Sequence, residues 1–221
     1  MVRKSKLPLD TLFDTTNIEG EENEKVFEIT ERIEKELSQF PEFIGVFSFG
    51  SRIKGYADEN IIESKTGMSG SDYDVYVFED RNLKVKDTAF GVLCEIGREY
   101  RKKGIKIQFI FQLLSMENLC SLFAMTDVVD FAYVPLLGFS NLCGFGSGEK
   151  IEEWRNKVKE EISKLPKEKQ ETMFQLFSDC LLTCDKKSLS KIQERIPDFD
   201  KEAYLNARRE LWTKRVREIY G

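Results

Sequence analysis

In two stretches of the first half of the chain, the apolar residues have helical spacing. Between 23 and 40 they recur every three or four positions, which predicts an amphipathic helix that Pro41 ends. The stretch 86–103 predicts a second helix, ended by Gly104. We expect the buried side of this second helix to be formed by Phe90, Leu93, Cys94 and Gly97.

Three short apolar runs lie between and after these helices, at 44–49, 72–78 and 105–114. Their length and their content of β-branched and aromatic residues predict strands. The first run ends in a Gly-Ser turn, after which 52–57 predicts the start of a short helix. The polar, glycine-containing stretch 58–70 predicts an exposed loop.

The rest of the chain is predicted to be mostly helical. Residues 115–146 are mixed and apolar, and 144–148 predicts a loop. From 149 onward the apolar stripes have helical spacing and start at Ile151, Met173, Leu189 and Tyr204. We therefore predict an α+β chain in which an α/β domain with an N-terminal arm and helix (1–145) precedes a helical C-terminal domain (146–221).

Composition narrows the possible chemistry. Hydrophobic residues make up 41% of the chain, enough for a substantial core, and the formal net charge of -5 argues against a uniformly basic nucleic-acid binder. The chain contains no histidine. This excludes Ser-His-Asp and Cys-His catalysis and zinc held by histidine. Catalysis must therefore use carboxylates, lysine, tyrosine, backbone groups or a hard metal ion.

Cysteine usage and the termini predict a cytoplasmic protein. The cysteines are odd in number and form no C-x-x-C pair, so we expect reduced and mostly buried thiols at Cys94, Cys120, Cys143, Cys180 and Cys184. Residues 1–12 contain no continuous apolar stretch of the kind that a signal peptide needs. The apolar zone 108–142 is interrupted by acids, which argues against a membrane span.

Two aspartates, Asp72 and Asp74, lie two positions apart in a predicted strand. Side chains alternate along a strand, so both carboxylates face one side, roughly 6 to 7 Å apart at their bases, while Tyr73, Val75 and Val77 face the other. Two carboxylates so placed repel each other unless a cation lies between them. A lone D-x-D pattern is also common on solvated surfaces, so the pair alone does not establish a metal site.

A candidate phosphate-binding turn precedes the aspartates. Gly50 lets the backbone approach an anion, and Ser51 adds a hydroxyl donor. A helix that started after Ser51 would direct its free N–H groups at the same anion, and Arg52 and Lys54 would add positive charge. The alternative is an ordinary strand-to-helix turn with both basic side chains in solvent.

Together the segments GSRIKG (50–55) and SDYDVYV (71–77) resemble the signature of the polymerase-β-like nucleotidyltransferase superfamily, especially its minimal nucleotidyltransferase branch. The resemblance covers about 44–114. It implies a small mixed sheet backed by helices, often with a C-terminal helical bundle. It also implies transfer of a nucleoside monophosphate from a nucleoside triphosphate to an acceptor hydroxyl, assisted by Mg²⁺ or Mn²⁺.

The resemblance also implies roles for individual residues. Asp72 and Asp74 would be catalytic metal ligands, and the triphosphate would contact Gly50 and Ser51. Arg52 would be a phosphate or structural partner, with Lys54 and Ser71 also in the nucleotide-binding site. The acceptor stays open between a small molecule, a protein side chain and an RNA end.

This chain departs from the family pattern in two places. The segment between Ser51 and Asp72 is longer than usual, and it would serve as a lid, as an acceptor-binding loop or as a disordered insertion. Gln108 stands where the third carboxylate is expected. Either the acid comes from elsewhere, with Glu95, Glu99 and Glu117 as candidates, or one metal site is impaired.

Other functions remain to be weighed against the enzyme. One is a catalytically impaired relative that only binds, such as the antitoxin-like partner of a toxin. Glycosyltransferases also use D-x-D, but the upstream GSRIKG segment is not expected in them. Phosphatases with an aspartate nucleophile use D-x-D too, but they need threonine or valine at the position that Tyr76 occupies. The basic residues near the C-terminus alternate with acids and predict a solvated helix face, or else a site for an anionic acceptor such as tRNA: Lys201, Arg208, Arg209, Lys214, Arg215 and Arg217.

Overall fold

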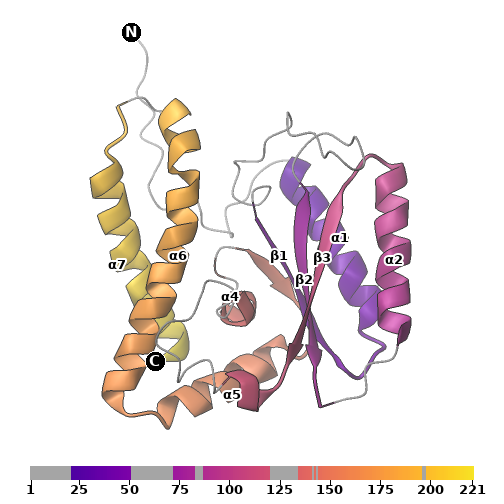
Figure 1. Ribbon diagram of the computed structural model, residues 1–221, viewed down its shortest axis with the longest axis horizontal. Coiled ribbons are helices and arrows are strands. Elements are labelled where there is room, and N and C mark those ends of the chain that lie inside the picture. The colour runs from indigo at the N-terminus through magenta and orange to yellow at the C-terminus, as the bar shows by residue number, and fades with distance from the viewer. Residues whose placement is uncertain are drawn as a thin grey trace.

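The computed structural model describes residues 21–50, 72–82, 87–119, 134–140, 142, 144–195 and 198–221. These residues form an α+β structure in which helices cover both faces of one mixed sheet (Figure 1). The expected class, a small mixed sheet backed by helices, is confirmed at this level. Every helix in the described ranges is too short or too polar to cross a lipid bilayer.

The sheet has four strands in the order β3-β2-β1-β4. The three predicted strands are confirmed as β1 (Phe43–Phe49), β2 (Tyr73–Asp80) and β3 (Ile107–Leu114). β1 pairs antiparallel with β2, whereas β2 pairs parallel with β3. Consequently the C-terminal end of β1 and the N-terminal ends of β2 and β3 lie at the same end of the sheet.

The fourth strand, β4 (Phe145–Ser147), corrects the prediction of a loop over 144–148. It pairs antiparallel with β1, with Phe47 opposite Gly146. The close approach explains the glycine that follows the strand: a Cβ on Gly148 would lie 2.6 Å from the carbonyl oxygen of Ile44. Gly148, which had suggested a loop, therefore lets the chain after β4 pack closely against β1.

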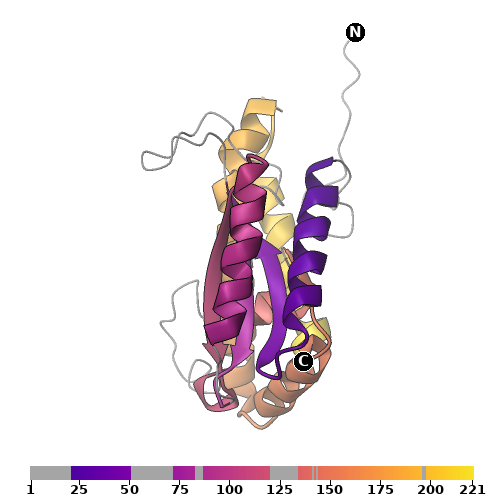
Figure 2. The same ribbon diagram turned by 90° about the vertical axis from the view of Figure 1, so that its right-hand side faces the viewer.

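One face of the sheet is covered by α1 (Glu21–Leu37) and α2 (Asp87–Lys102), which lie side by side in Figure 2. Both helices agree with the predicted ones, and Gly104, with φ 76°, follows α2 as expected. The buried side of α2 differs from the prediction. Leu93 is buried as predicted, but Phe90 is 60% exposed and Cys94 is exposed, and the other buried residues of this helix are Ala89, Ile96 and Tyr100.

The opposite face packs against α4 (Val134–Ser140) and α5 (Ile151–Ser163). Beyond them, α6 (Lys167–Arg195) and α7 (Lys201–Tyr220) run side by side (Figure 1). α6 is a single helix that contains both the Met173 stripe and the Leu189 stripe, which sequence spacing had separated.

A single apolar core joins the sheet to these helices. Phe47 and Phe78 belong to the same buried cluster as Trp154, Phe177 and Trp212, so both tryptophans are core residues as expected. The boundary proposed between 145 and 146 falls inside β4, and the two-domain division stays a prediction.

Candidate functional site

The candidate site lies where β1 ends and β2 and β3 begin. Strand pairing sets Phe49 opposite Asp74, and Asp74 opposite Gln108. Gly50, Asp74 and Gln108 are therefore neighbours across three adjacent segments, although 58 positions separate the first from the last in the sequence.

The two carboxylates point to the face that α4 and α5 cover. Tyr73, Val75 and Val77 are buried against α1 and α2, as the alternation predicted. Tyr76, from the same side of β2 as the aspartates, packs in the core beneath α4 and α5. Asp72 and Asp74 are only partly buried.

Gly50 and Asp74 fit each other closely. Gly50 has φ 106°, a conformation that residues with side chains rarely adopt. An ideal Cβ at this position would lie 3.1 Å from the Asp74 Cγ and inside contact distance of its Oδ2. The missing side chain therefore makes room for the Asp74 carboxylate.

The pKa of Asp74 is raised to about 6. Burial is the main cause, the neighbouring charge of Asp72 adds to it, and the charge of Lys106 opposes it. The Lys106 Nζ lies 3.9 Å from the Asp72 Oδ2. Sequence reasoning missed Lys106, although its position two residues before Gln108 on a strand would have placed it on the same face.

Gln108 is exposed and lies next to Asp74, where an acid was expected. The alternative acids lie elsewhere. Glu95 and Glu99 belong to α2, behind the opposite face, and Glu99 pairs with Arg32 at 2.7 Å. Glu117 follows β3 at its far end, roughly 20 Å from Gln108. None of the three joins the aspartates.

Four of the predicted site residues lie outside the described residues: Ser51, Arg52, Lys54 and Ser71. The same holds for the predicted short helix at 52–57 and the predicted loop at 58–70. The described part of the site thus consists of Gly50, Asp72, Asp74 and Gln108, together with Lys106.

The donor set fits one hard divalent cation. Two carboxylates on one face supply the oxygen ligands that Mg²⁺ and Mn²⁺ prefer. Among the described residues no group of three Asp, Glu, Cys or His side chains could hold a metal ion. With these two carboxylates as the protein ligands, water and phosphate oxygens would complete the coordination of the cation.

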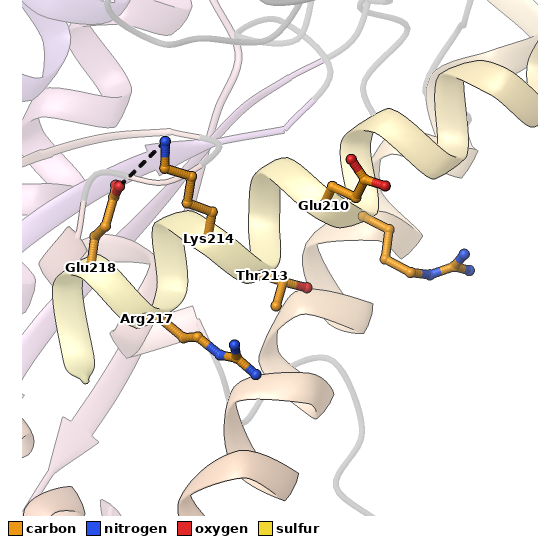
Figure 3. A pocket seen from close by; sticks show the side chains of 6 residues that line it. Glu210, Thr213, Lys214, Arg217 and Glu218 are labelled. Atoms are coloured by element: carbon orange, nitrogen blue, oxygen red, sulfur yellow. Dashed lines mark ion pairs between the residues drawn. The ribbon is translucent and has the colours of Figure 1, made fainter.

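A separate hollow of about 640 Å³ lies along α7 (Figure 3). Its lining mixes signs of charge: Lys214 pairs with Glu218 at 3.8 Å, and Arg217 pairs with Glu171 at 2.6 Å. This supports the solvated face predicted for most of the C-terminal basic residues. Arg208 is the correction, because it is only 2% exposed, with its guanidinium carbon 4.3 Å from the centre of the Trp212 ring.

Cysteine placement is mixed. Cys180 is buried as expected, whereas Cys94 is exposed on α2. The side chains of Cys120, Cys143 and Cys184 lie outside the described part of the structure.

Comparison with known proteins adds no neighbour. No family model, no curated protein and no solved structure matches this chain. The functional argument therefore depends on the residues of the site.

Proposed function

We propose that this chain is a metal-dependent nucleotidyltransferase, which moves a nucleoside monophosphate from a nucleoside triphosphate to an acceptor hydroxyl. The observation that carries the proposal is the Asp74 carboxylate set against the Gly50 turn, with Asp72 on the same face. The GSRIKG and SDYDVYV segments and the α+β architecture support it.

In the proposed reaction the acceptor oxygen forms a bond to the α-phosphorus of the triphosphate. The bond from that phosphorus to the oxygen bridging the β-phosphate breaks, and pyrophosphate leaves with the electron pair. The acceptor proton passes to solvent water, since the Gln108 amide has no basic group. Asp72 and Asp74 would hold a divalent cation, which supplies charge neutralisation for the phosphates.

A second candidate is a binding protein with the same fold and no turnover, such as an antitoxin-like partner. The observation that favours it is Gln108, which lies opposite Asp74 where the family resemblance implies an acid. A neutral amide is a weaker ligand for a hard cation than a carboxylate is.

One experiment separates the two candidates. The protein is incubated with each labelled nucleoside triphosphate, Mg²⁺ or Mn²⁺, and small-molecule, protein and RNA acceptors. Asp72→Asn and Asp74→Asn test the site, and Asp80→Asn, at the other end of the same strand, is the matched control. Pyrophosphate release that only the site variants lose supports the enzyme.

The remaining outcomes have distinct meanings. Triphosphate binding without turnover, lost in the site variants, supports the binding protein. If wild-type protein of intact fold binds no triphosphate with either metal, the nucleotidyltransferase proposal is wrong.

A further inference from the structure

Lys106 builds a fixed positive charge into the carboxylate face. Its Nζ lies 3.9 Å from the Asp72 Oδ2, and the two side chains are 20% and 28% exposed. The Tyr73 N–H donates to the Lys106 carbonyl oxygen at 2.9 Å, which holds the lysine beside Asp72 just before β3. The ammonium is thus part of the site, held there by backbone pairing as well as by charge.

The same face lacks a third anionic ligand among the described residues. Gln108, next in line on β3, is neutral, and Glu95 and Glu99 lie behind the sheet. Two carboxylates can serve one hard cation, with phosphate oxygens and water completing its coordination. With ligands from the described residues alone, a second divalent ion would have to share these carboxylates and would approach the Lys106 ammonium, which repels it.

We propose that the site holds a single divalent cation and that the Lys106 ammonium takes the place of a second one. This inference rests on the proposed nucleotidyltransferase function and deepens it. Asp72 and Asp74 hold the one metal ion, and Lys106 neutralises Asp72 in the free protein and faces the phosphates once triphosphate is bound. Gln108 fits this arrangement because its neutral side chain adds no third carboxylate to those that the described residues bring to this face.

The alternative is that Lys106 only forms a structural ion pair with Asp72. Replacing it would then change stability without changing metal stoichiometry. Counting metal ions separates the two readings, because the count does not depend on turnover.

The test is a Mn²⁺ titration followed by electron paramagnetic resonance, with and without an α,β-methylene nucleoside triphosphate. We expect one Mn²⁺ per wild-type chain in both conditions. The double variant Lys106→Met/Gln108→Asp removes the ammonium and adds a carboxylate, and we expect it to bind two Mn²⁺ when the analogue is present.

Single substitutions of Lys106 test how its positive charge affects the affinities for Mn²⁺ and for the triphosphate analogue. In Lys106→Met we expect Mn²⁺ to bind the nucleotide-free protein several-fold more tightly, because a competing cation is gone, and the triphosphate analogue to bind about tenfold more weakly. Lys106→Arg should keep both affinities near wild type. Lys103→Met is the matched control, because Lys103 lies over the Tyr100 ring, away from the site, and should change neither affinity.

The outcomes are distinguishable from failure of the proposed function. Two Mn²⁺ on the wild-type chain, both lost in Asp74→Asn, overturn the single-cation inference and leave the nucleotidyltransferase proposal standing. Lys106→Met affinities equal to those of Lys103→Met also overturn it. If Asp72→Asn and Asp74→Asn change neither Mn²⁺ nor triphosphate binding, the proposed function itself fails. Even if the double variant does not fold, the number of Mn²⁺ ions bound per wild-type chain tests the single-cation inference.

Discussion

The Asp74 carboxylate occupies the space that a side chain on Gly50 would fill. Gly50 directly follows β1 and has a positive φ, and Asp74 pairs with the residue before it, Phe49. The two positions therefore depend on each other. Glycine permits the positive φ, and its missing side chain lets the carboxylate lie at the strand end.

Replacing Gly50 tests this fit. Gly50→Ala should lower the free energy of unfolding by about 2 kcal/mol, because it combines a strained φ with a clash against Asp74. It should also abolish Mn²⁺ binding by displacing the carboxylate. Urea denaturation and Mn²⁺ titration measure the two effects.

The control for this variant is Gly91→Ala in α2, where a Cβ meets no atom within 4 Å. It should stabilise the protein by up to about 1 kcal/mol, through helix propensity. Asp74→Ala in the Gly50→Ala background should recover part of the lost stability if the clash is real. Strictly additive effects of the two substitutions would show that these residues do not meet.

The raised pKa of Asp74 predicts how stability depends on pH. The folded-state pKa of about 6 exceeds the ordinary aspartate pKa of 3.8, so the folded protein binds the proton more tightly than the unfolded chain does. Stability should fall as pH rises from about 4 to 6 and stay reduced above. Asp74→Asn removes this penalty.

We therefore expect Asp74→Asn to raise the free energy of unfolding by about 1 kcal/mol at pH 7.5, a value reduced for solvent screening because the side chain is partly exposed. At pH 4 the gain should vanish. Urea titrations across this range measure it, with the exposed Asp198→Asn as control. A gain of equal size at both pH values would contradict the assigned titration.

Proton competition at Asp74 also predicts the pH dependence of metal binding. A cation binds the ionised carboxylate, and the pKa of Asp74 is about 6 in the metal-free protein. The affinity for Mn²⁺ should therefore fall about tenfold between pH 7 and pH 5. Calorimetric titration measures it. An affinity that stays constant over this interval would exclude Asp74 as a ligand.

Local sequence pattern predicted the elements that carry the described site. The apolar runs marked β1, β2 and β3 because those strands are long enough to show strand character without their neighbours. Alternation along β2 predicted that Asp72 and Asp74 share a face, opposite Tyr73. The strand order, which brings Gln108 beside Asp74, is a long-range property that no local period encodes.

The errors have the same physical origin. β4 is three residues long and contains glycine, so only its pairing with β1 identifies it as a strand. The helix period of α2 fitted more than one face, and packing against α1 and the sheet buries Tyr100 and leaves Phe90 outside. Arg208 was predicted to be solvent-exposed like its charged neighbours, because sequence spacing does not show which side of α7 faces the core.

Arg208 should contribute to stability rather than to anion binding. Its buried guanidinium lies against the Trp212 ring, so Arg208→Ala removes a cation–π contact and leaves a cavity in the core. We expect a loss of about 2 to 3 kcal/mol in the free energy of unfolding, measured by urea denaturation. The adjacent Arg209 is exposed, and Arg209→Ala should cost less than about 0.5 kcal/mol. Similar losses in both variants would mean that Arg208 is not a core residue and would return it to the solvated face predicted for its basic neighbours.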